Sequence, residues 1–168
     1  DALILASYGR ERQPQVHTTS HSVQQSLARE IEALSQDLAR LKNRLEAATH
    51  GLTHPEVKAS LQRRIKALEE EKKELEKQLE QELQQQQATS LVLLESIPGI
   101  GKRSACLLLA ELGDISRFDS SAALVAFAGL NPGRFESGTS VHKQSAISRK
   151  GSSHLRHWLY MPSVAGLR

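Results

Sequence analysis

The stretch Glu95-Ser-Ile-Pro-Gly-Ile-Gly-Lys-Arg-Ser-Ala105 contains an apolar turn with one proline and two glycines, followed directly by two cations. The apolar run at residues 106–112 then predicts a helix. Glycine lets the backbone approach a neighbouring group closely, and the first turn of a helix offers unpaired N–H groups that favour anions. The pattern predicts a helix-hairpin-helix motif that contacts the phosphates of a nucleic acid. The candidate contacts are Gly99, Gly101, Lys102 and Arg103.

A turn of this kind also joins helices in bundles that bind no ligand. The helix dipole prefers anions at the start of a helix, so a purely structural hairpin would gain nothing from Lys102 and Arg103 there. The two cations therefore favour the nucleic-acid interpretation of the turn over the structural one.

Two heptad seams precede this turn and predict an antiparallel coiled-coil hairpin. Between them, Gly51 can cap a first helix and Pro55 can stand in the first turn of a second, so two helices of about 30 residues are expected. The first seam consists of Leu27, Ile31, Leu34, Leu38, Leu41 and Leu45. The second consists of Leu61, Ile65, Leu68, Lys72, Leu75 and Leu79.

The sequence predicts a mainly α fold in three parts. Residues 20–90 form the coiled-coil stalk, and residues 91–168 form a compact helical domain that carries the helix-hairpin-helix. Residues 1–19 precede the stalk, and the glutamine tract at residues 84–87 is interpreted as a fraying helix end or a linker. Because a two-helix core is thin, we expect the stalk to form a homo-oligomer, most simply a dimer.

Composition adds charge and compartment to this picture. The formal net charge is +3, and residues 134–168 hold six lysines and arginines against one acid, which is typical of a phosphate-binding surface. The single cysteine excludes a disulfide within the chain and favours a reducing, intracellular compartment. No run of about 20 apolar residues predicts a membrane span. Because the chain starts at Asp1, we expect a piece of a longer polypeptide.

The hydroxyl-rich segment at residues 133–151 is the candidate for chemistry. A serine can attack a phosphodiester when cations or a metal stabilise the developing charge, and Ser137 is followed by a glycine that leaves room for a bulky backbone. Ser140, Ser145 and Ser148 are chemically equivalent candidates, and a plain Ser-Gly turn is the alternative.

Six short motifs follow one another along the second half of the chain. They are Ile97-Pro-Gly-Ile-Gly101, Ala110-Glu-Leu-Gly-Asp114, Phe127-Ala-Gly-Leu-Asn-Pro132, Ser137-Gly138, Ile147-Ser-Arg-Lys-Gly151 and Leu155-Arg156. In this order they resemble the C-terminal domain of the bacterial insertion-sequence transposases of the IS one-ten group, which are DEDD transposases described as bridge-RNA-guided recombinases. The resemblance implies a location in the bacterial cytoplasm, with the nucleoid. The stalk ahead of them is similar in placement to the dimerising segment of that family.

The resemblance implies a DNA transposase or recombinase in which Ser137 is the nucleophile and takes a DNA end as a phosphoserine bond. Residues 1–19 resemble the C-terminal end of a RuvC-like domain that binds Mg²⁺, and Asp1 would be the last of its acidic ligands. One carboxylate cannot hold that ion, so the piece alone is expected to bind no metal and to show little or no strand cleavage. The cations implied to grip DNA or guide RNA are Arg134, Lys143, Arg149, Lys150 and Arg156.

Two other classes of function stay open at this point. In a non-catalytic module, the turn and the basic block would bind DNA or RNA, and Ser137 would be only a turn residue. A coiled-coil scaffold without a nucleic-acid partner would explain residues 20–90 but not the basic block at the end of the chain.

Overall fold

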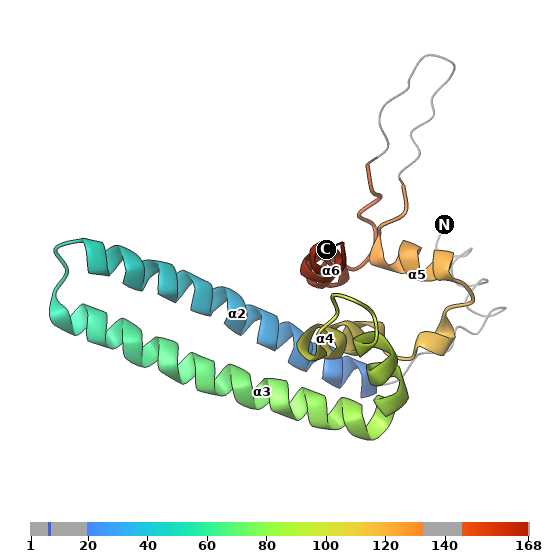
Figure 1. Ribbon diagram of the computed structural model, residues 1–168, viewed down its shortest axis with the longest axis horizontal. Coiled ribbons are helices and arrows are strands. Elements are labelled where there is room, and N and C mark those ends of the chain that lie inside the picture. Colours follow the sequence, from blue (N-terminus) through green and yellow to red (C-terminus); the bar gives the residue numbers. More distant parts are fainter. Residues whose placement is uncertain (1–6, 8–19, 133–145, 168) are drawn as a thin grey trace, which may run out of the picture.

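The computed structural model describes residue 7 and residues 20–132 and 146–167, and these form a mainly α fold, as predicted (Figure 1). Within these ranges there is no strand, only an isolated antiparallel bridge between Pro132 and Ile147. The helices are α2 (Ser20–His50), α3 (Pro55–Glu95), α4 (Lys102–Leu112), the 3₁₀ helix η1 (Ile115–Arg117), α5 (Ser121–Ala128) and α6 (Ser153–Gly166).

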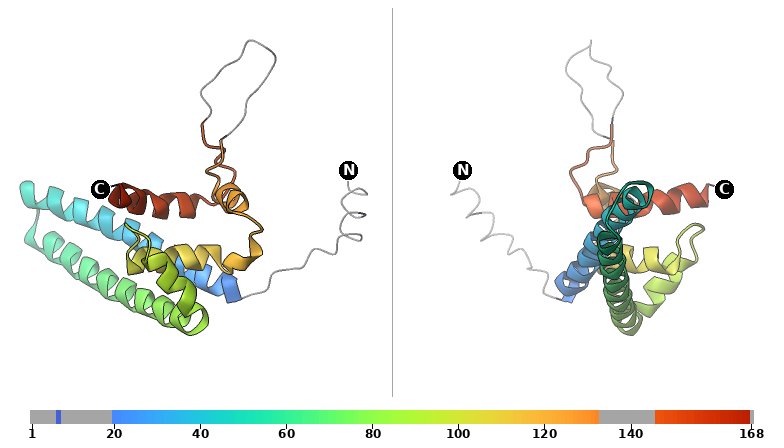
Figure 2. Two further views of the ribbon diagram at one scale, coloured as in Figure 1. Left: turned by 45° about the vertical axis from the view of Figure 1, so that its right-hand side comes forward. Right: turned by 90° about the vertical axis from the view of Figure 1, so that its left-hand side faces the viewer.

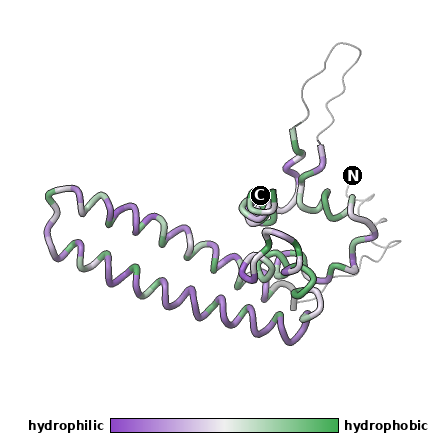
Figure 3. The backbone as a smooth tube through the Cα atoms, viewed as in Figure 1, coloured by the Kyte–Doolittle hydropathy of each residue, from purple (hydrophilic) through white to green (hydrophobic). Residues whose placement is uncertain are grey.

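Helices α2 and α3 form a long antiparallel hairpin, with their connecting turn at the end far from α4 and α6 (Figure 1). The leucines and isoleucines of both predicted seams are buried or half-buried, so the periodicity identified the contact face correctly. Lys72, the polar seam residue, keeps its side chain 21% exposed and places Nζ 3.7 Å from Glu76 Oε1. Figure 3 shows that both helices are largely hydrophilic outside this contact.

The turn between α2 and α3 follows the local sequence rules. Helix α2 ends at His50, and α3 starts at Pro55, whose missing N–H group costs nothing in a first turn. His54 caps α3, because its Nδ1 accepts a hydrogen bond from the Glu56 N–H at 3.2 Å. Gly51 lies in the bend between the two helices.

The second helix is interrupted at the glutamine tract, where a helix end or a linker was predicted. Helix α3 spans 41 residues from Pro55 to Glu95, but it consists of two helical segments that meet at the end of the tract. The backbone departs from helical values at Gln87, with φ −141° and ψ 38°, and the helix kinks there. The helix continues because Leu91, 1% exposed, is buried in the core beyond the kink. The predicted boundary between stalk and compact domain, residue 90, lies three residues after this kink, within the second helical segment.

The main core lies where α4 meets the base of the hairpin. Every residue of α4 from Ala105 to Leu112 is buried, so this helix is surrounded on all sides. Its neighbours in the core include Ala28 and Ile31 of α2, Leu79 and Leu83 of α3, and Leu155 and Trp158 of α6. A second, smaller cluster around Leu41 and Ile65 fills the distal half of the hairpin. The base of the stalk and the C-terminal helices thus share one core.

Helix α6 runs crosswise to the hairpin, since it is seen end-on in Figure 1 and lengthwise in the right view of Figure 2. It begins after Ser152, whose hydroxyl accepts from the Leu155 N–H, and it continues through Pro162 to Gly166. Helix α5 is capped in the same way by Ser120, and it ends at Gly129 in the left-handed conformation. Among the described residues, no helix has the length and apolar character of a membrane span.

Candidate functional site

The two flanks of residues 133–145, which contain Ser137, are tied together at their base. Pro132 and Ile147 form the antiparallel bridge. One step further from the segment, the Ser148 N–H donates to the Asn131 carbonyl at 2.8 Å, and the Ser148 hydroxyl donates to Asn131 Oδ1 at 2.6 Å. Of the four serines considered as nucleophile, Ser148 thus has its hydroxyl in a structural hydrogen bond. The other three lie outside the described residues.

Two glycines allow these flanks to meet behind the bridge. Gly129 has φ +69°, and a Cβ atom on Gly151 would lie 2.1 Å from the Phe127 carbonyl oxygen. The same carbonyl accepts a hydrogen bond from the Ser152 N–H at 2.9 Å, so any side chain at position 151 would push this contact apart. The chain leaving α5 and the chain entering α6 are therefore in direct backbone contact.

Arg156 fixes this junction from α6. Its Nη1 donates to the carbonyls of Ala128 and Gly151, each at 2.9 Å, and of Ser152 at 3.1 Å. A guanidinium is suited to such a position because it keeps its charge and presents several donors in one plane. The side chain predicted to grip phosphate thus has a structural task in the described part of the chain, and its contact with nucleic acid stays a prediction.

Glu111 joins the same junction to the hairpin. The carboxylate is nearly fully buried, with a residue exposure of 2%. It accepts hydrogen bonds from the Ser152 hydroxyl at 2.8 Å and from Arg29 Nη2 of α2 at 3.2 Å. One carboxylate therefore links α2, α4 and the start of α6. Glu111 is the only acid in the apolar run at residues 105–112, and a buried carboxylate nearly always has a hydrogen-bond or ionic partner. This signal in the sequence was missed, and no role was predicted for Glu111.

A second carboxylate, Glu32 of α2, holds the side of α6 that faces the hairpin. It is 8% exposed and accepts from Trp158 Nε1 at 3.0 Å, and His157 Nε2 lies 3.1 Å from its other oxygen. Burial raises the pKa of the Glu32 carboxyl, but hydrogen bonds from Gln36 and Trp158 outweigh this effect. The nearby charges of His157 and Arg103 act in the same direction, so the pKa lies below its ordinary value.

The glycine turn before α4 serves two purposes. Gly99 has φ +89°, and a Cβ atom there would lie 2.4 Å from the Pro162 carbonyl oxygen, so this glycine permits α6 to pack against the turn. Gly101 has no atom within 4 Å of a Cβ position and adopts an extended φ of −83°. The need for glycine at position 99 is thus explained by the packing of α6. At position 101 the space that a side chain would occupy is open.

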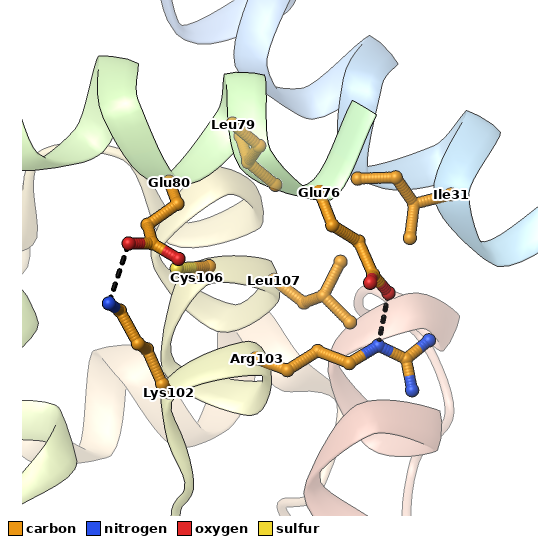
Figure 4. Close-up of a pocket in the computed structure, with 8 residues that line it drawn as sticks. All are labelled: Ile31, Glu76, Leu79, Glu80, Lys102, Arg103, Cys106 and Leu107. Carbon is orange, nitrogen blue, oxygen red and sulfur yellow. Dashed lines mark ion pairs between the residues drawn. The ribbon is translucent and has the colours of Figure 1, made fainter. Parts of the chain in front are cut away.

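The cations at the start of α4 contact α3. Lys102 pairs with Glu80, and Arg103 Nε lies 2.7 Å from Glu76 Oε1 (Figure 4). The hydrogen bond and the charge of Glu80 raise the pKa of Lys102. The argument that a structural hairpin gains nothing from these cations is therefore wrong, because they pair with Glu76 and Glu80, which lie on either side of the last seam leucine, Leu79. Their contact with phosphate stays a prediction.

These ion pairs border a pocket of about 220 Å³ between α2, α3 and α4 (Figure 4). Its apolar wall is formed by Ile31, Leu79 and Leu107, with Cys106 beside them. Burial, followed by the nearby charges of glutamates, raises the pKa of the Cys106 thiol to about 11. A thiol with so little thiolate at neutral pH is a poor nucleophile.

The remaining predicted site residues fall into two groups. Arg149 and Lys150 are exposed and directly follow the tied base, and Arg149 has φ 55°, the one positive value at a non-glycine residue of the described chain. Asp1, Ser137, Arg134 and Lys143 lie outside the described residues. In the described ranges, no group of three or more His, Cys, Asp or Glu side chains is placed to hold a metal ion.

The C-terminal part of the chain is similar to a family of known proteins. Residues 91–168, somewhat less than half of the chain, match the model described as Transposase IS116/IS110/IS902 family. The match starts at Leu91, inside α3, and includes the glycine turn, the tied base and α6.

Individual proteins also show similarity to part of this chain. The chain is 49% identical over 72 residues to a pilin gene-inverting protein of Moraxella bovis, covering 43% of this chain and 22% of that protein. It is 38% identical over 73 residues to an uncharacterized 43.6 kDa protein of insertion element IS110 from Streptomyces coelicolor, covering 44% and 18%. It is 39% identical over 75 residues to the transposase for insertion sequence element IS1111A of Coxiella burnetii, covering 45% and 20%. The matched region is about a fifth of the length of these relatives.

Proposed function

We propose that this chain is the strand-joining part of an insertion-sequence transposase or DNA recombinase, with Ser137 as its nucleophile. The Ser137 hydroxyl oxygen attacks a DNA phosphorus, a serine–phosphate ester forms, one phosphodiester P–O bond breaks, and the hydroxyl proton passes to the leaving oxygen. Attack of a second DNA end on this ester then releases the serine and joins the new strands.

The similarity of residues 91–168 to transposases, and to a protein named for gene inversion, is the observation that carries this proposal. The geometry supports it in a second way. Catalytic segments work best on rigid supports, and both flanks of residues 133–145 are anchored by the Gly129–Gly151 contact and by Arg156. Ser148 is disfavoured as the nucleophile because its hydroxyl is engaged by Asn131.

The acidic half of the chemistry is assigned to a RuvC-like domain outside residues 20–168, with Asp1 as one of its ligands. When bound there, Mg²⁺ would stabilise the charge that develops on the phosphoryl oxygens. The described residues offer no group of three or more carboxylates of their own, so residues 20–168 are proposed to contribute the serine and nearby cations in the sequence rather than the metal site. Arg149 and Lys150, exposed beside the tied base, are proposed to hold the DNA or guide-RNA backbone next to Ser137.

A recombination assay with substitutions at each serine tests the assignment. With the RuvC-like domain present, Ser137→Ala is expected to abolish strand exchange and the covalent protein–DNA adduct while leaving DNA binding intact. Ser140→Ala and Ser145→Ala are matched controls that keep both. Mass spectrometry of the trapped adduct should find the nucleotide on Ser137. Unchanged recombination by Ser137→Ala would favour another serine or a non-catalytic binding module.

The glycine turn is tested with a matched pair of substitutions. Gly101→Ala is expected to preserve stability, because a methyl group there meets open space, and to weaken nucleic-acid binding if phosphate approaches this turn. Gly99→Ala is expected to destabilise the packing of α6 regardless of nucleic acid. Unchanged binding by a stably folded Gly101→Ala would assign the turn to internal packing alone.

A further inference from the structure

The hairpin has a strong charge polarity that its overall charge conceals. Its distal half, residues 39–68, holds seven lysines and arginines against two glutamates, a formal charge of +5. The two segments of its proximal half, residues 20–38 and 69–90, hold four against ten acids, a formal charge of −6. The acidic half faces the cations of α4, as the Glu76 and Glu80 ion pairs show. The recorded ion pairs of the distal cations all stay within the hairpin; they join Arg40 to Asp37, Lys42 to Glu69 and Lys66 to Glu70.

The distal cations are not spread evenly around the hairpin. In an antiparallel pair, residues that directly follow a seam position on either helix share one flank, and residues that directly precede one share the other. Lys42 and Glu69 each follow a seam leucine, and their ion pair at 2.7 Å confirms that they share a flank. Arg40, Arg44 and Arg64 each precede a seam residue and therefore share the opposite flank.

This second surface, defined by Arg40, Arg44 and Arg64, is called the arginine flank. Arg44 and Arg64 are exposed and form no ion pair among the described residues, and Arg40 is 74% exposed beside Asp37. No acid precedes a seam position between Arg40 and the end of α2, or between Arg64 and Leu68 on α3. Its cations are thus left largely without internal counter-charges, unlike Lys42 on the other flank.

We propose that the arginine flank is a second binding surface for a nucleic-acid backbone, separate from the Ser137 region. Arginine presents its donors in a planar fork that matches phosphate oxygens. The distal half extends about 18 Å along each helix beyond the shared core, so it can reach a nucleic-acid strand beside the one held near α6. The proposal rests on the proposed function in taking nucleic acid as the partner.

A protein partner fits this surface less well. Between residues 39 and 68, Leu52 and Val57 are the only exposed large apolar side chains, and both lie at the turn. Stable protein interfaces have an apolar core, which the faces of the distal hairpin do not offer. Binding to phosphates requires only accessible cations, because the release of condensed counterions supplies much of the free energy.

Fluorescence anisotropy of this chain with two labelled probes, a 20-base-pair DNA duplex and a 20-nucleotide RNA of mixed sequence, tests the proposal. Arg44→Gln/Arg64→Gln is compared with Lys73→Gln/Lys77→Gln, which removes the same charge from exposed side chains of the proximal half. The arginine pair is expected to weaken binding about tenfold near 0.1 M salt and to lower the slope of log Kd against log salt by about 1.8 for duplex DNA. The lysine pair should change affinity less than twofold.

The probe that loses more affinity identifies DNA or RNA as the occupant. An equal loss of affinity in the two double variants would show that only net charge matters. That result would overturn the proposal that the arginine flank is a binding surface and would leave the proposed function intact. A lost self-association in sedimentation equilibrium with unchanged probe binding would overturn it in favour of a second copy of the chain. Absence of binding by the unmodified chain to both probes would contradict the nucleic-acid partner itself, and with it the proposed function.

Discussion

The hairpin and the C-terminal helices bury apolar surface in different ways. Along most of the hairpin, a repeating seam places leucines and isoleucines against each other, and each contact resembles the next. From Ser96 onward, helices are short, and their positions depend on single features: Gly99 beneath α6, Gly151 beneath Phe127, and two buried carboxylates. We therefore expect the hairpin to tolerate a substitution at one seam position, because the other seam contacts remain. The packing of the C-terminal helices should depend on a few individual residues.

The sharpest test of this contrast is a cavity in each core. Leu83→Ala, in the core shared with α4, is expected to lower the free energy of unfolding by about 2–5 kcal/mol. Leu41→Ala, in the distal cluster, should cost less, because the open end of the hairpin can relax around the cavity. Urea unfolding followed by the fluorescence of Trp158, the only tryptophan, provides the measurement. Equal losses would remove the distinction between the two regions.

Gly151→Ala probes the backbone contact at the base of the candidate segment. The added methyl group would lie 2.1 Å from the Phe127 carbonyl oxygen, and neither backbone can yield without breaking the Ser152 hydrogen bond. We expect a loss of about 1–3 kcal/mol in unfolding free energy. Gly51→Ala, in the hairpin turn with its nearest contact at 3.4 Å, is the matched control and should change stability little. A neutral Gly151→Ala would show that the two flanks are not rigidly joined.

Substitutions of Glu111 test whether its hydrogen bonds, rather than its packing alone, hold α2, α4 and the start of α6 together. Glu111→Ala leaves the Ser152 hydroxyl and the Arg29 guanidinium without their partner, which we expect to cost about 1–2 kcal/mol because Arg29 can regain water. Glu111→Gln keeps one acceptor and should cost less. Thermal unfolding by circular dichroism compares the two, with Glu30→Ala on the exposed surface of α2 as control. A larger loss for the glutamine variant would contradict this role.

The smallest effect concerns pH. The pKa of Glu32 is lower in the folded chain than its ordinary value of about 4.3, so its contribution to stability is complete above that value. It is lost as the pH falls through the lowered pKa, and α6 should then separate from α2. A red shift of Trp158 emission below about pH 4 would report this event. Glu32→Gln should remove that acid transition, and its persistence would assign the transition to other carboxylates.

Sequence reasoning predicted the repetitive parts of the fold well. The seams and the break before Pro55 follow from local rules that need only a few neighbouring residues. The helix break at the end of the glutamine tract also agrees with the prediction, but the helical segment beyond it, up to Glu95, was not foreseen, because it is held by the burial of Leu91. That burial depends on α4, which no local pattern around residue 87 reveals.

The candidate site was predictable only in part. The order of motifs located the transposase-like region at residues 91–168, in agreement with the family match. The roles of individual side chains did not follow: Lys102 and Arg103 were interpreted as phosphate contacts, yet both pair with glutamates about 20 or more residues earlier in the chain. Arg156 donates to three carbonyls near the tied base. Charge type is visible in a sequence, but the partner of a charge is not.

By itself, the sequence determined the helical class, the hairpin and the charge polarity of its two halves, because these depend on spacing along one chain. The tertiary structure decided which cations are neutralised internally and which stay open to a partner. It also decided that Gly99 is needed for packing while Gly101 is not. The physical reason is distance: helical periodicity acts over a few residues, whereas ion pairs and close backbone contacts join residues that only folding brings together.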